Sequence, residues 1–192
     1  MKQVCNEYRK PQNGRALTRV KTPNLQMHPH HQLIREFYRA FSARDAEAMA
    51  RCYHREIAFS DPVFPMLRGE DAGDMWRMLL ARAADLEVTL DEAEADAEGG
   101  QARWTARYTF SRTGRPVVNR VGAMFAFREG LIVRHFDSFS FWRWSRQALG
   151  PVGLAFGWSP PLRWKVRKDA DRALRLWIER RGAIPTATPS GN

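Results

Sequence analysis

The first apolar stripe in the chain has the spacing of an amphipathic helix. Positions at helical spacing carry Leu33, Ile34, Phe37, Tyr38 and Phe41. Such positions fall on one face at 3.6 residues per turn, and Pro29 is favourable in a first helical turn. The pattern predicts a helix over 29–43.

Shorter elements follow this helix. Asp45 is a suitable N-cap for a second, short helix that ends near His54. Ile57 to Ser60 reads as a short strand, which Asp61-Pro62 ends. A third helix is predicted over 70–84, with acidic residues in its first turns and arginines later, as the helix dipole favours.

The hydrophobic period then changes to the alternation of strands. Glycine-containing turns separate the segments 86–95, 102–112, 116–127 and 131–142. Short turns make consecutive strands antiparallel partners. Helices followed by a strand meander predict an α+β fold, with the helices covering one face of a curved sheet.

Alternation also separates the two faces of each strand, and one face is almost entirely apolar. A few polar or hydroxyl-bearing side chains interrupt this face: Tyr108, Asn119, His135 and Asp137. A carboxylate on an apolar face is costly unless it is paired or hydrogen-bonded. These residues are therefore the first candidates for chemistry.

His135 and Asp137 lie two residues apart on one strand, so their side chains can meet. They are either a general acid/base pair in a pocket, with Asp137 tuning the imidazole, or a buried structural network. Asn119 is either a buried amide whose hydrogen bonds are satisfied or a substrate contact. Tyr108 is predicted to be a core residue whose hydroxyl is hydrogen-bonded. Asp61 is a local turn carboxylate or a catalytic base. The local sequence leaves these alternatives open.

Length and composition exclude several classes of protein. A chain of 192 residues with 44% hydrophobic residues has the size and apolar content of one globular domain. It is neither collagen-like nor a disulfide-rich mini-protein, and no apolar run is long enough to span a membrane. Cys5 and Cys52 form no zinc or redox spacing. We expect a cytoplasmic protein.

The net charge of +10 is concentrated at the two ends. Residues 1–27 carry six cations and one anion, and residues 143–192 carry ten cations and three anions. The segment 28–142 is slightly acidic. We predict a disordered basic tail over 1–27, with Met27 as a candidate natural start. The folded domain is predicted over 28–142, and a Trp- and Arg-rich helical extension with a disordered end over 143–192.

The basic extension contains a helix predicted from about Pro161 to Arg181, in which cations alternate with apolar residues. Residues 149–181 are therefore either an element that binds weakly to an anionic membrane surface or a helix packed on the domain or on a dimer partner. Nucleic acid is not expected, because no recognition motif accompanies the cations. His28, His30 and His31 form no convincing metal-ligand set.

The order of elements, the Phe59-Ser60-Asp61-Pro62 strand end and the segment from His135 to Gly150 resemble a known family. The chain is similar to the SnoaL-like branch of the nuclear-transport-factor-2-like superfamily over roughly residues 28–142. This resemblance implies a cone-shaped curved sheet closed by the N-terminal helices, with a pocket inside.

The resemblance also suggests roles for individual residues. Asp61 matches the base of ketosteroid isomerase, whereas Phe37 and Ala123 stand where that enzyme has its oxyanion-hole tyrosine and aspartate. Asp137 matches the water-activating aspartate of limonene-epoxide hydrolase, but Gly122 replaces a second carboxylate. SnoaL-type cyclases use an aspartate and a histidine without a cofactor, and His135 with Asp137 is closest in kind.

We therefore predict a small-molecule-binding protein, an acid/base isomerase, cyclase, hydratase or epoxide hydrolase acting on an apolar organic compound without cofactor or metal. The catalytic residues would be Asp61, His135 and Asp137. The predicted substrate-binding residues are Tyr38, Trp76, Trp104, Tyr108, Asn119 and Phe139. The alternative is a non-catalytic ligand-binding or assembly module, and a homodimer through the sheet is expected.

Overall fold

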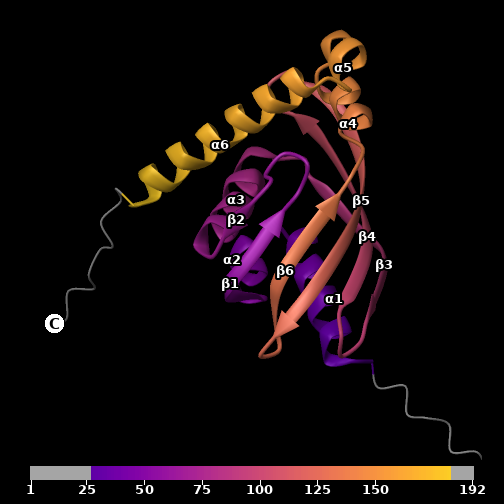
Figure 1. Cartoon of the computed structure of the whole chain (residues 1–192), viewed down its shortest axis with the longest axis vertical. Coiled ribbons are helices and arrows are strands. Elements are labelled where there is room, and N and C mark those ends of the chain that lie inside the picture. Colours follow the sequence, from indigo (N-terminus) through magenta and orange to yellow (C-terminus); the bar gives the residue numbers. More distant parts are fainter. Residues whose placement is uncertain (1–26, 183–192) are drawn as a thin grey trace, which may run out of the picture.

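The computed structural model describes residues 27–182, so the disorder predicted for the two ends of the chain lies outside the described residues. This part of the chain contains six helices and six strands, and Figure 1 shows their arrangement. The helices are α1 (Pro29–Ser42), α2 (Ala46–Arg51), α3 (Glu70–Arg82), α4 (Phe141–Ala148), α5 (Pro151–Phe156) and α6 (Pro160–Gly182). The strands are β1 (Tyr53–Ser60), β2 (Leu67–Arg68), β3 (Glu87–Ala95), β4 (Gly100–Phe110), β5 (Arg115–Arg128) and β6 (Leu131–Ser138).

The strands form one curved sheet in the order β2-β1-β6-β5-β4-β3. The meander from β3 to β6 is antiparallel, as its turns predict, whereas β1 pairs with β6 in parallel. The sheet curves around α1, and α3 lies on its β1 and β2 side (Figure 1). This open cone confirms the predicted α+β fold.

The core forms between this concave face and the N-terminal helices. Ile34, Phe37 and Phe41 of α1 are buried, as the helical stripe predicts. The inward sets of β4 and β5 are buried around them, for example Trp104 and Val121. Burying these side chains stabilises the fold by roughly 1.5–3 kcal/mol for each large one. The alternation pattern therefore identified the inner face of these two strands correctly.

Two predicted boundaries around the start of β1 are wrong, and both errors arise from long-range pairing. The second helix ends at Arg51, and β1 begins at Tyr53 rather than at Ile57. The reason is that the start of β1 pairs with β6, where the Ile132 amide donates to the Cys52 carbonyl at 2.9 Å. Local periodicity does not report a parallel partner so distant in sequence.

The predicted strand 131–142 is also too long, because β6 ends at Ser138. Ser140 instead caps α4, and its hydroxyl accepts a hydrogen bond from the Arg143 amide at 3.3 Å. Phe141 is therefore the first residue of a helix rather than a strand residue. A register shift between Ala126 and Phe127 of β5 also makes Ile132 the buried residue at the start of β6.

The long helix α6 crosses the domain over α3 (Figure 1). Leu174 anchors it in the core and is fully buried. Two ion pairs reach α3: Arg175 contacts Asp71 at 2.9 Å, and Arg181 contacts the buried Asp74 at 2.5 Å. The C-terminal extension thus packs on the domain itself, which places it next to the candidate site.

Candidate active site

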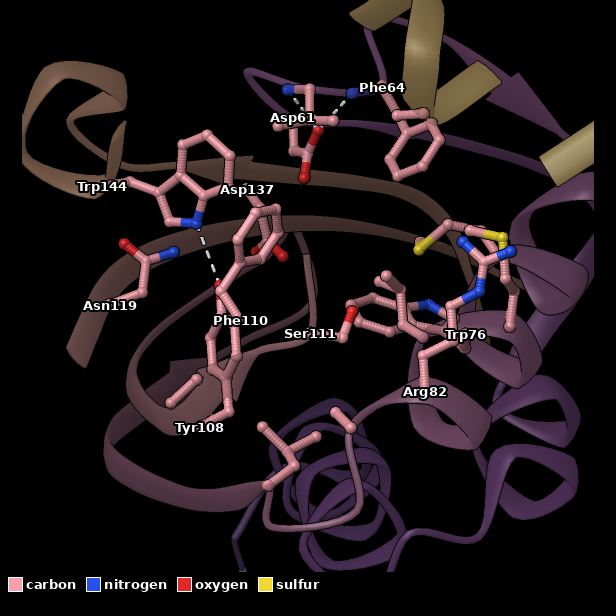
Figure 2. Close-up of a pocket in the computed structure, with 18 of the residues that line it drawn as sticks. Asp61, Phe64, Trp76, Arg82, Tyr108, Phe110, Ser111, Asn119, Asp137 and Trp144 are labelled. Atoms are coloured by element: carbon pink, nitrogen blue, oxygen red, sulfur yellow. Dashed lines mark hydrogen bonds between the residues drawn. The ribbon is translucent and has the colours of Figure 1, made fainter. Parts of the chain in front are cut away.

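One cavity of about 300 Å³ opens between the inner face of the sheet, α3 and α6. Most of its wall is apolar or aromatic, and Figure 2 shows polar groups reaching into it from different elements. Seven of the nine predicted site residues line it, namely Asp61, Trp76, Trp104, Tyr108, Asn119, Asp137 and Phe139. A mostly apolar pocket with a few convergent polar groups is the usual form of a small-molecule site.

Asp61 sits at the end of β1, where the chain turns. Its Oδ1 accepts hydrogen bonds from the amides of Val63 at 2.7 Å and Phe64 at 2.5 Å. Figure 2 shows the other carboxylate oxygen directed into the cavity. Arg167 of α6 donates to the Pro62 carbonyl at 2.9 Å and so ties this turn to the helix above it. The carboxylate both closes the turn and faces the cavity, so the two interpretations of Asp61 are compatible.

The environment of Asp61 favours its neutral form. The pKa of this carboxyl is raised from 3.8 to about 7. Burial is the main cause, and the negative charge of Asp137 contributes to the rise. The amide of Phe64 and the Arg167 guanidinium oppose the rise in pKa. Desolvation penalises a carboxylate more than these partners stabilise it. Asp61 is thus able to exchange a proton near neutral pH.

Asp137 begins a buried chain of hydrogen bonds that leads away from the cavity. Its Oδ1 lies 3.0 Å from Nε2 of His135, and Nδ1 of that ring lies 2.8 Å from the Tyr53 hydroxyl. The Trp76 indole donates to the same hydroxyl at 2.9 Å, and the Trp104 indole donates to Asp137 at 3.4 Å. The consistent tautomer has Tyr53 donating to Nδ1 and Nε2 donating to Asp137. Every member of the chain then has a partner, which fixes the orientation of the Asp137 carboxylate.

His135 itself lies behind the cavity wall. Its side chain is almost completely buried, and the rings of Phe37, Phe59 and Phe125 surround it. Its contact with the cavity therefore runs through Asp137, two residues along the same face of β6. Tyr53 is not among the site residues predicted from the sequence, because its contact with His135 depends on the parallel pairing of β1 with β6.

Tyr38 also lies outside the cavity wall. It is buried between the rings of Trp104 and Phe125. Burial raises the pKa of its phenol well above the usual value. Its hydroxyl has no hydrogen-bonding partner among residues 27–182. Tyr38 therefore supports Trp104 from behind rather than facing the pocket.

The opposite side of the cavity carries Tyr108 and Asn119. The Trp144 indole donates to the Tyr108 hydroxyl at 2.9 Å, so that hydroxyl is paired as predicted. Asn119 is half-buried on the neighbouring strand β5 and extends into the same space (Figure 2). Its amide is placed to contact an oxygen of a bound compound.

Helix α6 supplies a part of the wall that the sequence did not indicate. Val166, Ala170 and Ala173 face the cavity, and Asp169 binds Arg112 at 3.1 Å across its edge. The small side chains leave space beneath the helix. No local pattern predicts that the basic C-terminal helix returns over the pocket, because its position depends on distant ion pairs.

Enlarging a side chain of α6 tests whether the cavity holds ligands. Ala173→Phe should lower the affinity for an apolar probe such as 2-naphthol by about tenfold or more, because the ring occupies the cavity. Fluorescence titration measures this affinity. The matched control is Arg172→Phe on the exposed face of α6, which should leave it unchanged. Equal affinities in both variants would place naphthol binding elsewhere.

Within residues 27–182, no helix is long and apolar enough to cross a membrane. In the same range, no group of three or more His, Cys, Asp or Glu side chains is arranged to hold a metal ion. The predictions of no metal and no cofactor remain predictions. The candidate site is formed by the acidic, aromatic and amide side chains described above.

Comparison with solved structures finds the same fold in several bacterial proteins. An NTF2-like protein of unknown function from Burkholderia pseudomallei is 22% identical, with a TM-score of 0.53 over 59% of this chain and 92% of that chain. A putative polyketide cyclase from Streptomyces antibioticus is 21% identical, with a TM-score of 0.53 over 67% and 100%. An LEH-like epoxide hydrolase from M. tuberculosis is 19% identical, with a TM-score of 0.55 over 66% and 95%.

These likenesses show the fold, and no curated protein gives a significant match to the chain. The family model described as a SnoaL-like domain matches residues 34–135. That range is more than half of the 192-residue chain and contains Asp61, the strands β1 to β5 and the part of β6 up to His135. It confirms the resemblance noted from the sequence. The chain belongs to the SnoaL-like domain family.

Proposed function

We propose that this protein is a cofactor-independent acid/base enzyme that acts on a small, largely apolar organic compound. The observation that carries the proposal is the presence of two carboxylates, Asp61 and Asp137, on the wall of one mostly apolar cavity. One of them has a pKa near neutral. A general acid or base works best when its pKa is close to the working pH.

In this proposal Asp61 is the general base. Its cavity-facing oxygen removes a proton from the substrate or from a bound water, and the protonated acid then returns that proton to a different atom. Asp137, held by His135 and Trp104, orients a hydroxyl or water of the reactant. Asn119 donates a hydrogen bond to a developing oxyanion. Proton transfer beside a carbonyl, ring closure and water addition all suit this arrangement.

His135 acts through Asp137 and is a positioning residue in this mechanism. Its ring keeps one oxygen of the carboxylate occupied, which leaves the other for the reactant. The aromatic side chains of Trp76, Trp104 and Phe139 bind the apolar body of the compound. The solved relatives named as a putative polyketide cyclase and an epoxide hydrolase support this class of substrate without selecting one reaction.

The pH dependence of turnover tests the role of Asp61. A panel of α,β-unsaturated ketones, cyclic epoxides and aromatic polyketide-like β-ketones would first identify a compound that is converted. If Asp61 is the base, kcat/KM should rise with pH and level off above about 7, where the carboxylate is formed. Asp61→Asn should be inactive at every pH. A flat profile with an active Asp61→Asn variant would contradict the mechanism.

The alternative is a pocket that binds the compound without converting it. In that case no panel compound is converted, and Asp61→Asn changes only the affinity for bound compounds. A homodimer through the sheet and a cytoplasmic location remain predictions from the sequence. Analytical ultracentrifugation of the full chain measures the first, and cell fractionation measures the second.

A further inference from the structure

Six large apolar side chains project to solvent from the segment that joins β6 to α6 and from the first turns of α6. This group is called the aromatic tip below. Its members, with their exposed fractions, are Trp142 (38%), Val152 (54%), Leu154 (56%), Phe156 (56%), Trp158 (68%) and Trp164 (64%). Figure 1 shows α5 at one end of the molecule, and α4 joins it to the sheet, where Gln147 of α4 is hydrogen-bonded to the backbone of Val118 in β5. The aromatic tip thus lies at one end of the molecule.

The packing of α5 explains why these side chains point outward. Gly153 and Gly157 face α4, and a Cβ at Gly153 would lie 1.9 Å from the Ser145 carbonyl oxygen. Only glycine permits this close approach. The Ser145 hydroxyl also donates to the Gly153 carbonyl at 3.3 Å. The glycine face of α5 therefore packs on α4, and its large apolar residues are left to solvent.

The segment that carries the aromatic tip contains only positive charges, and the next residue along the chain, Asp169, lies 3.8 Å from Lys165. Residues 138–168 contain six Lys and Arg and no Asp or Glu. The Arg146 guanidinium lies 5.2 Å from the ring centroid of Trp142, and the Lys168 ammonium lies 4.9 Å from that of Trp164. Arg163 and Lys165 are exposed between them. Such a surface attracts an anionic partner that also accepts apolar side chains.

We propose that the aromatic tip docks the protein on an anionic lipid surface. Tryptophan beside Lys and Arg is the composition of elements that lie in a membrane interface, with the rings among the acyl chains and the cations at the headgroups. The inference is independent of the proposed acid/base function.

Vesicle co-sedimentation of the full chain tests this proposal. The probes are vesicles of phosphatidylcholine alone and of phosphatidylcholine with about 30% phosphatidylglycerol. The protein should bind the anionic vesicles and not the neutral ones. Raising the salt concentration from about 0.05 to about 0.5 M should weaken binding, because the attraction to the headgroups is screened. Failure to bind anionic vesicles at low salt would overturn the proposal.

Two pairs of variants locate the surface. Leu154→Ser/Phe156→Ser should reduce the partition coefficient by about tenfold or more. The matched control is Met124→Ser/Phe136→Ser, because these exposed residues are neighbours on β5 and β6, away from the tip. Arg163→Gln/Lys165→Gln should also weaken binding more than Arg120→Gln/Arg134→Gln on the sheet. All eight side chains are exposed, so unfolding midpoints should stay close to that of the unmodified protein.

The outcome separates lipid from other partners. Equal loss of vesicle binding in the tip and sheet variants would mean that overall charge, including that of residues 1–26, carries the binding, and would overturn the assignment. A different result would assign the tip to a second copy of the chain. In that case the unmodified protein would self-associate but not bind vesicles, and the Leu154→Ser/Phe156→Ser variant would lose the self-association. Selective loss in the tip variants supports lipid docking.

Discussion

Asp61→Asn should make the folded protein more stable above pH 7 while it removes catalysis. The carboxyl of Asp61 has a pKa near 7 in the folded protein and an ordinary value of 3.8. Between these two pH values the folded state binds more protons than the unfolded state, so the free energy of unfolding falls as pH rises. An Asn side chain has no charge to desolvate, and its carbonyl oxygen can accept the hydrogen bonds of Val63 and Phe64.

The expected gain at pH 8 is about 2 kcal/mol, reduced from the full value of the pKa shift because the carboxylate partly faces an open cavity. The gain should disappear below about pH 4, where both forms of the side chain are neutral. Chemical denaturation at pH 4, 6 and 8 measures it. A stabilising change that removes function is typical of a residue whose environment is suited to chemistry rather than to folding.

Asp96→Asn is the matched control, because it should act in the opposite direction. The amides of Glu98 and Gly99 donate to this turn carboxylate and lower its pKa. The charged form therefore stabilises the folded state above the unfolded pKa, and this contribution is lost as pH falls. Asp96→Asn should give no stabilisation at pH 8. A gain of equal size in both variants would show that a general effect of charge, and not the environment of Asp61, is responsible.

His135→Leu should destabilise the protein by about 3 kcal/mol, the largest loss expected from a single substitution in the site. Leucine neither accepts from the Tyr53 hydroxyl nor donates to Asp137. Tyr53 and Asp137 are both more than nine-tenths buried. The Asp137 carboxylate would lose its hydrogen bond from the imidazole, and a buried carboxylate without such compensation is costly. Chemical denaturation at pH 8 gives the free energy of unfolding. A loss below about 1 kcal/mol would contradict a fully connected network.

His135→Gln separates the structural role from the catalytic one. An amide can accept a hydrogen bond from Tyr53 at its oxygen and donate to Asp137 at its nitrogen, so this variant should lose about 1 kcal/mol only. If His135 positions Asp137 for chemistry, the kcat of the His135→Gln variant should nevertheless fall by about tenfold or more, measured on a compound of the panel that the unmodified protein converts. Unchanged turnover in the folded Gln variant would make the network purely structural.

Much of this site could be anticipated from local sequence. Alternation along the strands placed Asn119, His135 and Asp137 on the inner face, because successive side chains of a strand necessarily point to opposite sides. The stripe on α1 predicted which residues enter the core. The turn chemistry of Asp61-Pro62 marked the end of β1. These features depend on a few neighbouring residues, so the sequence alone determines them.

The interactions that give the site its chemistry depend on contacts between distant segments. The pKa of Asp61 is raised by burial in a cavity built from seven other elements and by the charge of Asp137. Tyr53 reaches His135 because β1 pairs in parallel with β6, and α6 covers the cavity because Asp71 and Asp74 bind its arginines. Local periodicity predicts which way a side chain faces, but packing between elements sets the distances and the desolvation. The sequence therefore determined the inner face of the sheet, and only the tertiary structure decided which of its polar groups meet.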